Sequence, residues 1–372
     1  MANPMIVPFV DLVAQYQSIK GDIDRAISEV LGTAAFIGGK WVTEFGDAFA
    51  RELGAKHCVP VGNGTDAIYI VLRMLGVGPG DEVIVPASSW ISTSEVVSQT
   101  GAMPVFVDVD ACMHIDAARI EAAVTGRTKA IIPVHLYGQA ADMDPILQVA
   151  SNRGLHVVED CAQAHFATYR GRRVGLFGVA GTFSFYPGKN LGAYGDAGAI
   201  VTGDDDLAMR CQMYANHGAL KKHEHMMEGV NSRLDGIQAA VLLVKLARIH
   251  DWNSRRAEIA GQYDRLLGGI PGLVTPVRRD GSTHVFHLYV VQCDRRDELQ
   301  SWLAARGIAT AIHYPTALPL LPAYRHLKKG PEDFPVAAAA HRRILSLPMY
   351  PEMPDAHITA VASAIREFAE RH

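Results

Sequence analysis

The sequence predicts an α/β protein in which a mostly parallel, mixed sheet is flanked by helices and is followed by a smaller C-terminal α+β domain. Three observations lead to this prediction. The chain has 372 residues, which is more than one compact core usually holds. From Cys58 onward, short β-branched segments alternate with helical ones, a pattern typical of parallel strands joined by helical crossovers. After Val201 this alternation stops and the pattern becomes helical again.

The elements of the large domain are predicted in order along the chain. Two amphipathic helices come first, over about 11–31 and 43–53. Strands are then expected at 58–61, 82–85, 104–107, 130–133 and 157–159, separated by helices at 65–75, 91–100, 116–123 and 143–153. Two further apolar segments follow at 180–186 and 199–201.

The last third of the chain is predicted to form the smaller domain. A long helix over about 232–267 leads into it, strands are expected at 287–293 and 309–313, and helices are expected near 295–306 and 355–370. We place the boundary within the long helix. The prediction is therefore a large domain over residues 1–245, including the N-terminal helices, and a small domain over residues 246–372.

Composition and charge narrow the function classes. Hydrophobic residues make up 49% of the chain and charged residues 20%, a balance typical of a soluble globular enzyme. The net charge of −4 provides no general attraction to nucleic acid or to an anionic membrane. No apolar run reaches the ~18–20 residues that a membrane span needs. Dispersed cysteines and the lack of a signal-peptide pattern at the N-terminus predict a cytoplasmic protein.

A carboxylate and a lysine are predicted to meet at one edge of the sheet. Asp160 directly follows the strand 157–159, and ligands of open α/β sheets bind beyond the carboxyl ends of the strands. Lys189 follows the apolar segment 180–186 through a Pro-Gly turn. Such a pair suits pyridoxal phosphate (PLP), because a lysine can hold it as a Schiff base and then act as a general base, while a carboxylate keeps the ring nitrogen protonated. On spacing alone, a solvated lysine and a helix N-cap remain alternatives.

Two further segments fall at the same edge. The turn 61–66, Val-Gly-Asn-Gly-Thr-Asp, joins a strand to a helix, and its glycines and N–H groups suit a phosphate, with Ser184 as a further donor. An ordinary helix cap would look the same. Trp90 follows the strand 82–85, where its indole could stack on a pyridine ring; a core or interface tryptophan is the alternative.

With these residues in place, the chain resembles the nucleotide-sugar aminotransferase family (DegT/StrS-like), whose members are fold-type I PLP enzymes. The blocks that carry the resemblance are GNGTDA (62–67), PVHLYGQAADMDPI (133–146), EDCAQAH (159–165), FSFYPGKNLGAYGDAGAI (183–200) and NSRLDGIQAA (231–240). A branch of this family has histidine in place of Lys189 and carries out dehydration or deoxygenation, so the lysine implies transamination. One departure is Phe166, which stands where the family commonly has glycine or another small residue.

The resemblance also implies roles for individual residues. Lys189 would form the internal aldimine, Asp160 would face the pyridine nitrogen, Trp90 would stack on the ring, Gln163 would lie near the phenolic oxygen, Gly64, Thr65 and Ser184 would bind the phosphate, and Asn231 would reach the phosphate of the neighbouring subunit. The last role implies a homodimer with shared active sites.

The substrate is suggested by the block NSRLD (231–235). It resembles the version in members that aminate a C-3 ketone of a nucleotide-linked hexose, whereas C-4 members more often have Asn-Tyr-Arg-Met there. The resemblance therefore implies a dTDP-linked 3-keto-6-deoxyhexose, with glutamate as the amino donor. The substrate-binding residues it suggests are Tyr194, Lys221, His223, Arg233, His313 and Tyr314. For the basic residues of the loop 217–230, a solvated charged loop is the alternative.

Several other functions stay open at this point. The substrate could be a UDP-linked 3-keto-hexuronic acid, a 4-keto sugar nucleotide or a keto-cyclitol of an aminoglycoside pathway. A PLP-binding regulator without turnover would be expected to carry a DNA-binding segment or to lack the lysine, and neither is seen. A dinucleotide or metal enzyme is disfavoured, because no G-x-G-x-x-G follows the first strand and the histidines lack zinc spacing.

Overall fold

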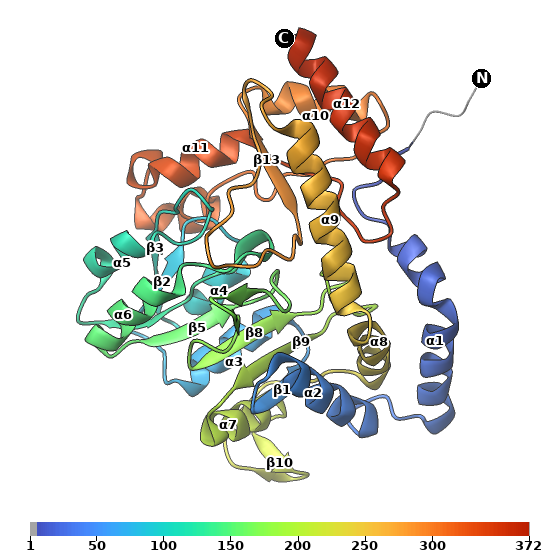
Figure 1. Cartoon of the computed structure of the whole chain (residues 1–372). Coiled ribbons are helices and arrows are strands. Elements are labelled where there is room, and N and C mark those ends of the chain that lie inside the picture. The colour runs from blue at the N-terminus through green and yellow to red at the C-terminus, as the bar shows by residue number, and fades with distance from the viewer. Residues whose placement is uncertain (1–5, 372) are drawn as a thin grey trace.

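The computed structural model describes residues 6–371, and a seven-stranded sheet lies at its centre (Figure 1). The strand order is β1-β9-β8-β5-β4-β2-β3. The strands are β1 (His57–Val61), β2 (Glu82–Pro86), β3 (Met103–Val107), β4 (Thr128–Ile131), β5 (His156–Asp160), β8 (Ala180–Ser184) and β9 (Gly198–Thr202). β9 runs antiparallel to both of its neighbours, and the other adjacent pairs are parallel. The predicted mixed, mostly parallel sheet is confirmed.

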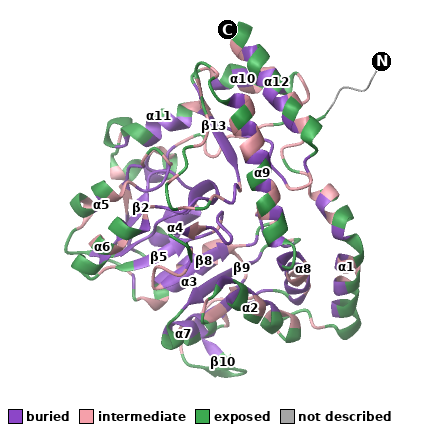
Figure 2. Ribbon diagram, in the orientation of Figure 1, coloured by how far each residue is buried: buried purple, intermediate pink, exposed green. Residues whose placement is uncertain are grey.

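Helices cover both faces of this sheet, because its strands are apolar on both sides. In β2, Val83 and Val85 are buried on one face of the sheet while Ile84 is buried on the other. One face is covered by α3 (Gly64–Met74), α4 (Ser92–Gln99) and α7 (Asp205–Ala215), and the other by α2 (Lys40–Leu53), α5 (Ala117–Ala123), α6 (Met143–Arg153) and α8 (Gly236–Leu246). Figure 2 shows the resulting burial of the strands.

The N-terminal helix α1 (Leu12–Thr33) lies at the edge of the molecule beside α8 (Figure 1). It begins where Asp11 accepts a hydrogen bond from the backbone N–H of Ala14 at 2.8 Å, an N-cap that satisfies one free donor of the first turn. Residues 1–5, part of the segment in which no signal peptide is expected, lie outside the described residues. Among residues 6–371, no helix combines the length and the hydrophobicity that crossing a lipid bilayer requires.

A second apolar core is built from the last third of the chain. It joins α9 (Ile249–Leu267), α10 (Arg296–Ala304) and α12 (Asp355–Arg371) to a small antiparallel sheet of β12 (Leu273–Val274), β13 (Tyr289–Cys293) and β14 (Ile344–Leu347). Helix α9 spans the two cores, with Trp252 in the first and Tyr263 in the second. The predicted division between residues 245 and 246 falls near the end of α8 and stays a prediction.

The remaining elements are short and lie around these two cores. They are β6 (Thr168–Tyr169) with β7 (Arg172–Arg173), β10 (Ala219–Lys221) with β11 (Glu224–His225), α11 (Pro335–Arg343), and 3-10 turns at Leu136–Gly138, Leu318–Leu320, Pro322–Leu327 and Pro331–Asp333.

Two predicted elements differ from the structure. The single helix over 232–267 is two helices, α8 and α9, with a break at 247–248: α8 is held between α1 and α2, whereas α9 turns away to reach the second core. The predicted strand at 309–313 forms only one bridge, between Ala311 and Ser346. It does not continue because His313 and Tyr314 line a cleft, and the following Pro315 has no N–H to donate.

Candidate active site

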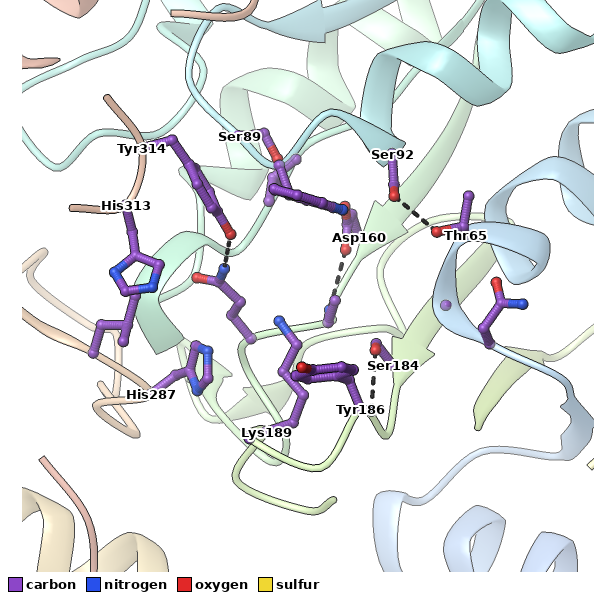
Figure 3. Close-up of a pocket in the computed structure, with 18 of the residues that line it drawn as sticks. Thr65, Ser89, Ser92, Asp160, Ser184, Tyr186, Lys189, His287, His313 and Tyr314 are labelled. Atoms are coloured by element: carbon purple, nitrogen blue, oxygen red, sulfur yellow. Dashed lines mark hydrogen bonds between the residues drawn. The ribbon is translucent and has the colours of Figure 1, made fainter. Parts of the chain in front are cut away.

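A cleft of about 560 Å³ opens where the carboxyl ends of β2, β5 and β8 approach the second core. Figure 3 shows side chains from these strand ends pointing into it, together with His313 and Tyr314. Of the residues predicted from the sequence, the structure brings together Gly64, Thr65, Trp90, Asp160, Gln163, Ser184, Lys189, His313 and Tyr314 around this cleft. The convergence follows from the parallel sheet, because strand ends that are distant in sequence share one edge.

Lys189 reaches the cleft from a tight turn after β8. Its backbone N–H donates to the carbonyl of Tyr186 at 2.8 Å. The turn needs glycine at position 192, because a Cβ there would lie 2.4 Å from the carbonyl oxygen of Pro187. Burial lowers the pKa of Lys189 to about 8, although the negative charge of Asp160 opposes the shift. A lysine so placed has a substantial neutral fraction near neutral pH.

Asp160 ends β5 and is held by donors on both carboxylate oxygens. The hydroxyl of Thr93 donates to Oδ2 at 3.0 Å, and the backbone N–H of Ala162 donates to Oδ1 at 3.1 Å. Ser89 lies 2.8 Å from the Thr93 hydroxyl, so the turn that carries Trp90 is linked to the carboxylate. Burial raises the pKa of Asp160, whereas these donors and the charge of Lys189 favour the ionised form.

The end of β5, where Asp160 lies, is anchored by the preceding residue, Glu159. Glu159 points to the opposite face and accepts backbone N–H groups from the loop 175–178 at 2.6–2.8 Å. It also contacts Nε2 of His135 at 3.0 Å, and since Ala141 donates its N–H to Nδ1 of that ring, Nε2 carries the proton. Four donors therefore satisfy this buried carboxylate, and they keep the end of β5 in place.

The turn before α3 forms a cradle beside Ser184. Asn63 caps the helix by accepting the N–H of Asp66 at 2.8 Å, and the first N–H groups of a helix have no partner within it. Gly64 is required, because a Cβ there would lie 2.6 Å from the Cβ of Ser184. Thr65 places its hydroxyl 2.7 Å from that of Ser92. Free N–H groups and hydroxyls at a helix N-terminus are a suitable environment for a phosphate.

An aromatic wall closes the opposite side. The Trp90 and Tyr314 rings lie 5.4 Å apart, and the Trp90 side chain is 56% exposed, so one of its faces is free to stack. Gln163 donates from Nε2 to the Tyr314 hydroxyl at 3.2 Å and accepts the backbone N–H of Tyr137 at 2.7 Å. Nδ1 of His313 lies 2.8 Å from the hydroxyl of Ser346. Gln163 and Tyr314 therefore join the two cores across the cleft.

Five predicted residues lie outside the cleft of their own chain. Tyr194 packs its ring 4.3 Å from the Lys245 ammonium. On the hairpin β10–β11, Lys221 pairs with Glu224, and His223 is exposed in the turn. Asn231 is exposed, and Nη1 of Arg233 donates to Asn216 at 3.2 Å. Their predicted roles stay predictions.

Several cleft residues were not foreseen from the sequence. They include Phe9, Ser89, Ser92, Tyr186, Asp196, Arg256, His287 and Met349. Ser89 and Ser92 are close to the predicted Trp90, so they could have been included by adjacency. No local pattern points to Arg256 or His287, because only the packing of the second core brings them to the cleft.

Phe166, the departure noted above, has a φ of 66°, in the left-handed region that favours glycine. Its ring packs edge-on against Phe49 at 5.6 Å, and the Arg173 guanidinium lies 5.3 Å from its centre. A conformation natural to glycine is thus retained, and the larger side chain fills the adjoining core.

The residues of the cleft fit PLP. Lys189 offers an amine with a lowered pKa, Asp160 a buried carboxylate, and the cradle at Gly64 a phosphate site that only glycine allows. Trp90 offers an exposed ring face. The chemical groups of the cleft therefore match a flat, phosphorylated heterocycle with an aldehyde.

The lowered pKa of Lys189 leads to a prediction for the apoenzyme. Burial disfavours the charged ammonium, so the neutral, nucleophilic amine should predominate from about pH 8 upward instead of from 10.5. The rate at which PLP is trapped on Lys189 by borohydride should therefore be half-maximal near pH 8, as read by peptide mass. In Asp160→Asn the opposing charge is lost, so the midpoint should move lower still. A midpoint near 10.5 in the wild type would contradict the burial argument.

Comparisons with known proteins agree with this geometry. The sequence profile described as the DegT/DnrJ/EryC1/StrS aminotransferase family matches residues 17–366. The chain is 46% identical over 366 residues to a dTDP-3-amino-3,4,6-trideoxy-alpha-D-glucose transaminase of Streptomyces venezuelae, covering 98% of this chain and 97% of the relative. It is 43% identical over 361 residues to a UDP-2-acetamido-2-deoxy-3-oxo-D-glucuronate aminotransferase of Pseudomonas aeruginosa, covering 97% and 99%.

Solved structures show the same fold. The S. venezuelae protein DesV, in complex with a ketimine intermediate, superposes with a TM-score of 0.97 at 46% identity, covering 100% of both chains. The protein NtdA of Bacillus subtilis, with the bound cofactor PMP, superposes with a TM-score of 0.92 at 31% identity, covering 99% of this chain and 86% of that one.

Proposed function

The chain belongs to the DegT/DnrJ/EryC1/StrS aminotransferase family, and we propose that it transfers an amino group from glutamate to a dTDP-linked 3-keto-6-deoxyhexose, giving the 3-amino sugar and 2-oxoglutarate. It is an aminotransferase whose cofactor is PLP. One observation carries the proposal: Lys189 and Asp160 meet in a single cleft beside the cradle at Gly64.

The chemistry divides between the cofactor and the chain. When bound, PLP supplies an electron-withdrawing ring that stabilises negative charge at a carbon that loses its proton. Lys189 would move that proton, because its lowered pKa favours the neutral amine that can act as a base. Asp160 would accept a hydrogen bond from the ring nitrogen and keep the proton there, while Thr93 and Ala162 keep the carboxylate oriented.

The other cleft residues bind and orient. Gly64, Thr65 and Ser184 would hold the phosphate, and Trp90 would stack on the ring. Gln163 uses one amide hydrogen on Tyr314, which leaves the second for the phenolic oxygen side of the cofactor. We assign His313 and Tyr314, which also line the cleft, to binding of the substrate. Contacts at both ends of the cofactor would hold its ring beside the Lys189 amine, and such positioning favours reaction.

We propose further that two chains form a homodimer with shared active sites. Asn231 would reach the phosphate of the neighbouring subunit, and Tyr194, Lys221, His223 and Arg233 would meet the neighbour's substrate. Two observations support this arrangement. These five side chains lie outside their own cleft, and large apolar side chains, among them Ile37 at 58% and Met226 at 76% exposure, are open to solvent in the single chain.

A UDP-linked 3-keto-hexuronic acid is the second candidate, because the P. aeruginosa relative is named for such a substrate. A hexuronate carboxylate calls for a cation besides Lys189. Among the described residues that line the cleft, the other lysine or arginine is Arg256, and its Nη1 donates to the backbone carbonyls of Phe286, His287 and Met349. Because Nη1 of Arg256 is engaged by backbone, a cation for the hexuronate carboxylate would have to come from the neighbouring subunit, whose Lys221 and Arg233 are proposed above to meet the substrate.

The substrate can be tested by running the reaction backward. Purified holoenzyme would be given 2-oxoglutarate with a dTDP-3-amino-, a dTDP-4-amino- or a UDP-3-amino-hexuronate sugar, and glutamate formation would be measured. We expect glutamate from the dTDP-linked 3-amino sugar. Turnover of the 4-amino sugar without the 3-amino sugar would contradict the position of amination, and turnover of the hexuronate alone would favour the second candidate.

A further inference from the structure

His287 lies in the wall of the cleft, and none of the roles proposed above uses it. It comes two residues before β13, and Figure 3 shows it between Lys189 and His313. It follows Phe286, a residue of the second core, and its side chain lines the cleft. Its chemistry depends on which ring nitrogen carries the proton.

The neighbouring amides decide the position of that proton. Asn190 donates from Nδ2 to the carbonyl of Val285 at 2.9 Å and to Oδ1 of Asn253 at 2.8 Å. A backbone carbonyl can only accept, so the Asn190 amide nitrogen must be on that side. Asn253 is fixed in the same way, because its Nδ2 donates to the carbonyl of His165 at 3.0 Å.

Only the amide oxygen of Asn190 remains to face His287, and it lies 3.2 Å from Nδ1 of the ring. An amide oxygen cannot donate, so Nδ1 must carry the proton. Burial lowers the pKa of His287 well below its ordinary value, and the positive charges of Lys189 and Arg256 lower it further. In a neutral ring with the proton on Nδ1, Nε2 holds a lone pair.

We propose that Nε2 of His287 accepts a hydrogen bond from a ring hydroxyl of the sugar substrate; this inference rests on the proposed function. The two carboxylates of glutamate have no proton to donate at neutral pH, so they cannot use this acceptor. A sugar hydroxyl can. His287 therefore serves the half-reaction with the sugar and contributes little to the half-reaction with glutamate.

Two variants separate this role from a structural one. His287→Asn keeps an N–H that can reach the Asn190 oxygen and removes the acceptor from the cleft. His287→Gln does the reverse, because its amide oxygen can take the place of Nε2 while the donor to Asn190 is lost. His156→Asn, at the exposed start of β5, is the matched control.

The experiment uses holoenzyme and two probes that drive the same spectral change. The visible absorbance of the bound cofactor would be followed in single turnovers with glutamate and with dTDP-3-amino-3,4,6-trideoxy-α-D-glucose, whose ring has one hydroxyl. In His287→Asn we expect kcat/KM for the amino sugar to fall about 10- to 100-fold, as for a buried hydroxyl left without its partner. The value for glutamate should stay close to that of the wild type, and His287→Gln should recover most of the sugar reaction.

The opposite order, with His287→Gln more damaged than His287→Asn, would overturn the inference, because it would mean that the ring only holds Asn190. Equal losses with both probes would overturn it as well. If wild-type holoenzyme reacts with glutamate and not with the amino sugar, the proposed substrate is wrong, and the inference falls with it. A wild type that reacts with both probes, with His287→Asn unchanged on both, would leave the proposed function intact and overturn the inference alone.

Discussion

Replacing Lys189 by alanine is expected to lower the rate of transamination by at least about 10²–10⁴-fold, the range typical of a positioned general acid–base group. The loss has two causes, because the variant lacks both the amine that binds the cofactor and the base that moves the proton. Wild-type holoenzyme should be yellow and should be bleached by glutamate. Lys189→Ala should lack the lysine-bound absorbance band, and glutamate formation should be nearly abolished.

Two controls make this result specific. Lys189→Arg keeps a positive charge, but guanidinium does not lose its proton in proteins, so it should be as inactive as alanine. Lys129→Ala, at an exposed position in β4, should keep both colour and rate. A wild type without colour, or a spectrum that persists unchanged in Lys189→Ala, would contradict the assignment.

Asp160→Asn is expected to lower kcat/KM by roughly 10- to 150-fold. The substitution keeps the shape of the side chain but removes the negative charge, and a hydrogen bond to a charged group contributes about 1.5–3 kcal/mol. The pH profile should also change. In the wild type, burial raises the pKa of Asp160 above its ordinary 3.8, so activity should be lost as the pH falls through this raised value.

The fall in activity at acidic pH distinguishes loss of the Asp160 charge from a general loss of structure in the variant. Asparagine does not titrate. The rate of Asp160→Asn should therefore be low, and its pH profile should lack the fall at acidic pH that protonation of Asp160 causes in the wild type. Asp280→Asn, at an exposed position, should keep the wild-type rate and profile. A rate close to that of the wild type in Asp160→Asn would show that the carboxylate does not hold the ring nitrogen.

Much of the sheet was predictable from local pattern. The strands β2, β3 and β5 lie where short β-branched runs end at turn residues, and apolar residues such as 83–85 and 157–158 are buried beneath the covering helices. The break between α8 and α9 was not predictable, since both halves are helical in pattern and only the second core draws α9 away. The failed strand at 309–313 has a similar cause: its side chains are used by the cleft.

The sequence by itself determined which chemical groups stand at the ends of the strands, among them Lys189 in its turn and Asp160 after β5. These positions depend on residues close by in the chain, so local rules were enough. The contacts that tune those groups join residues far apart: Thr93 and Asp160 are separated by 67 positions, and Asn190 and His287 by 97. Only the tertiary structure decided the lowered pKa of Lys189 and the tautomer of His287, because burial and hydrogen-bond direction arise when distant segments pack together.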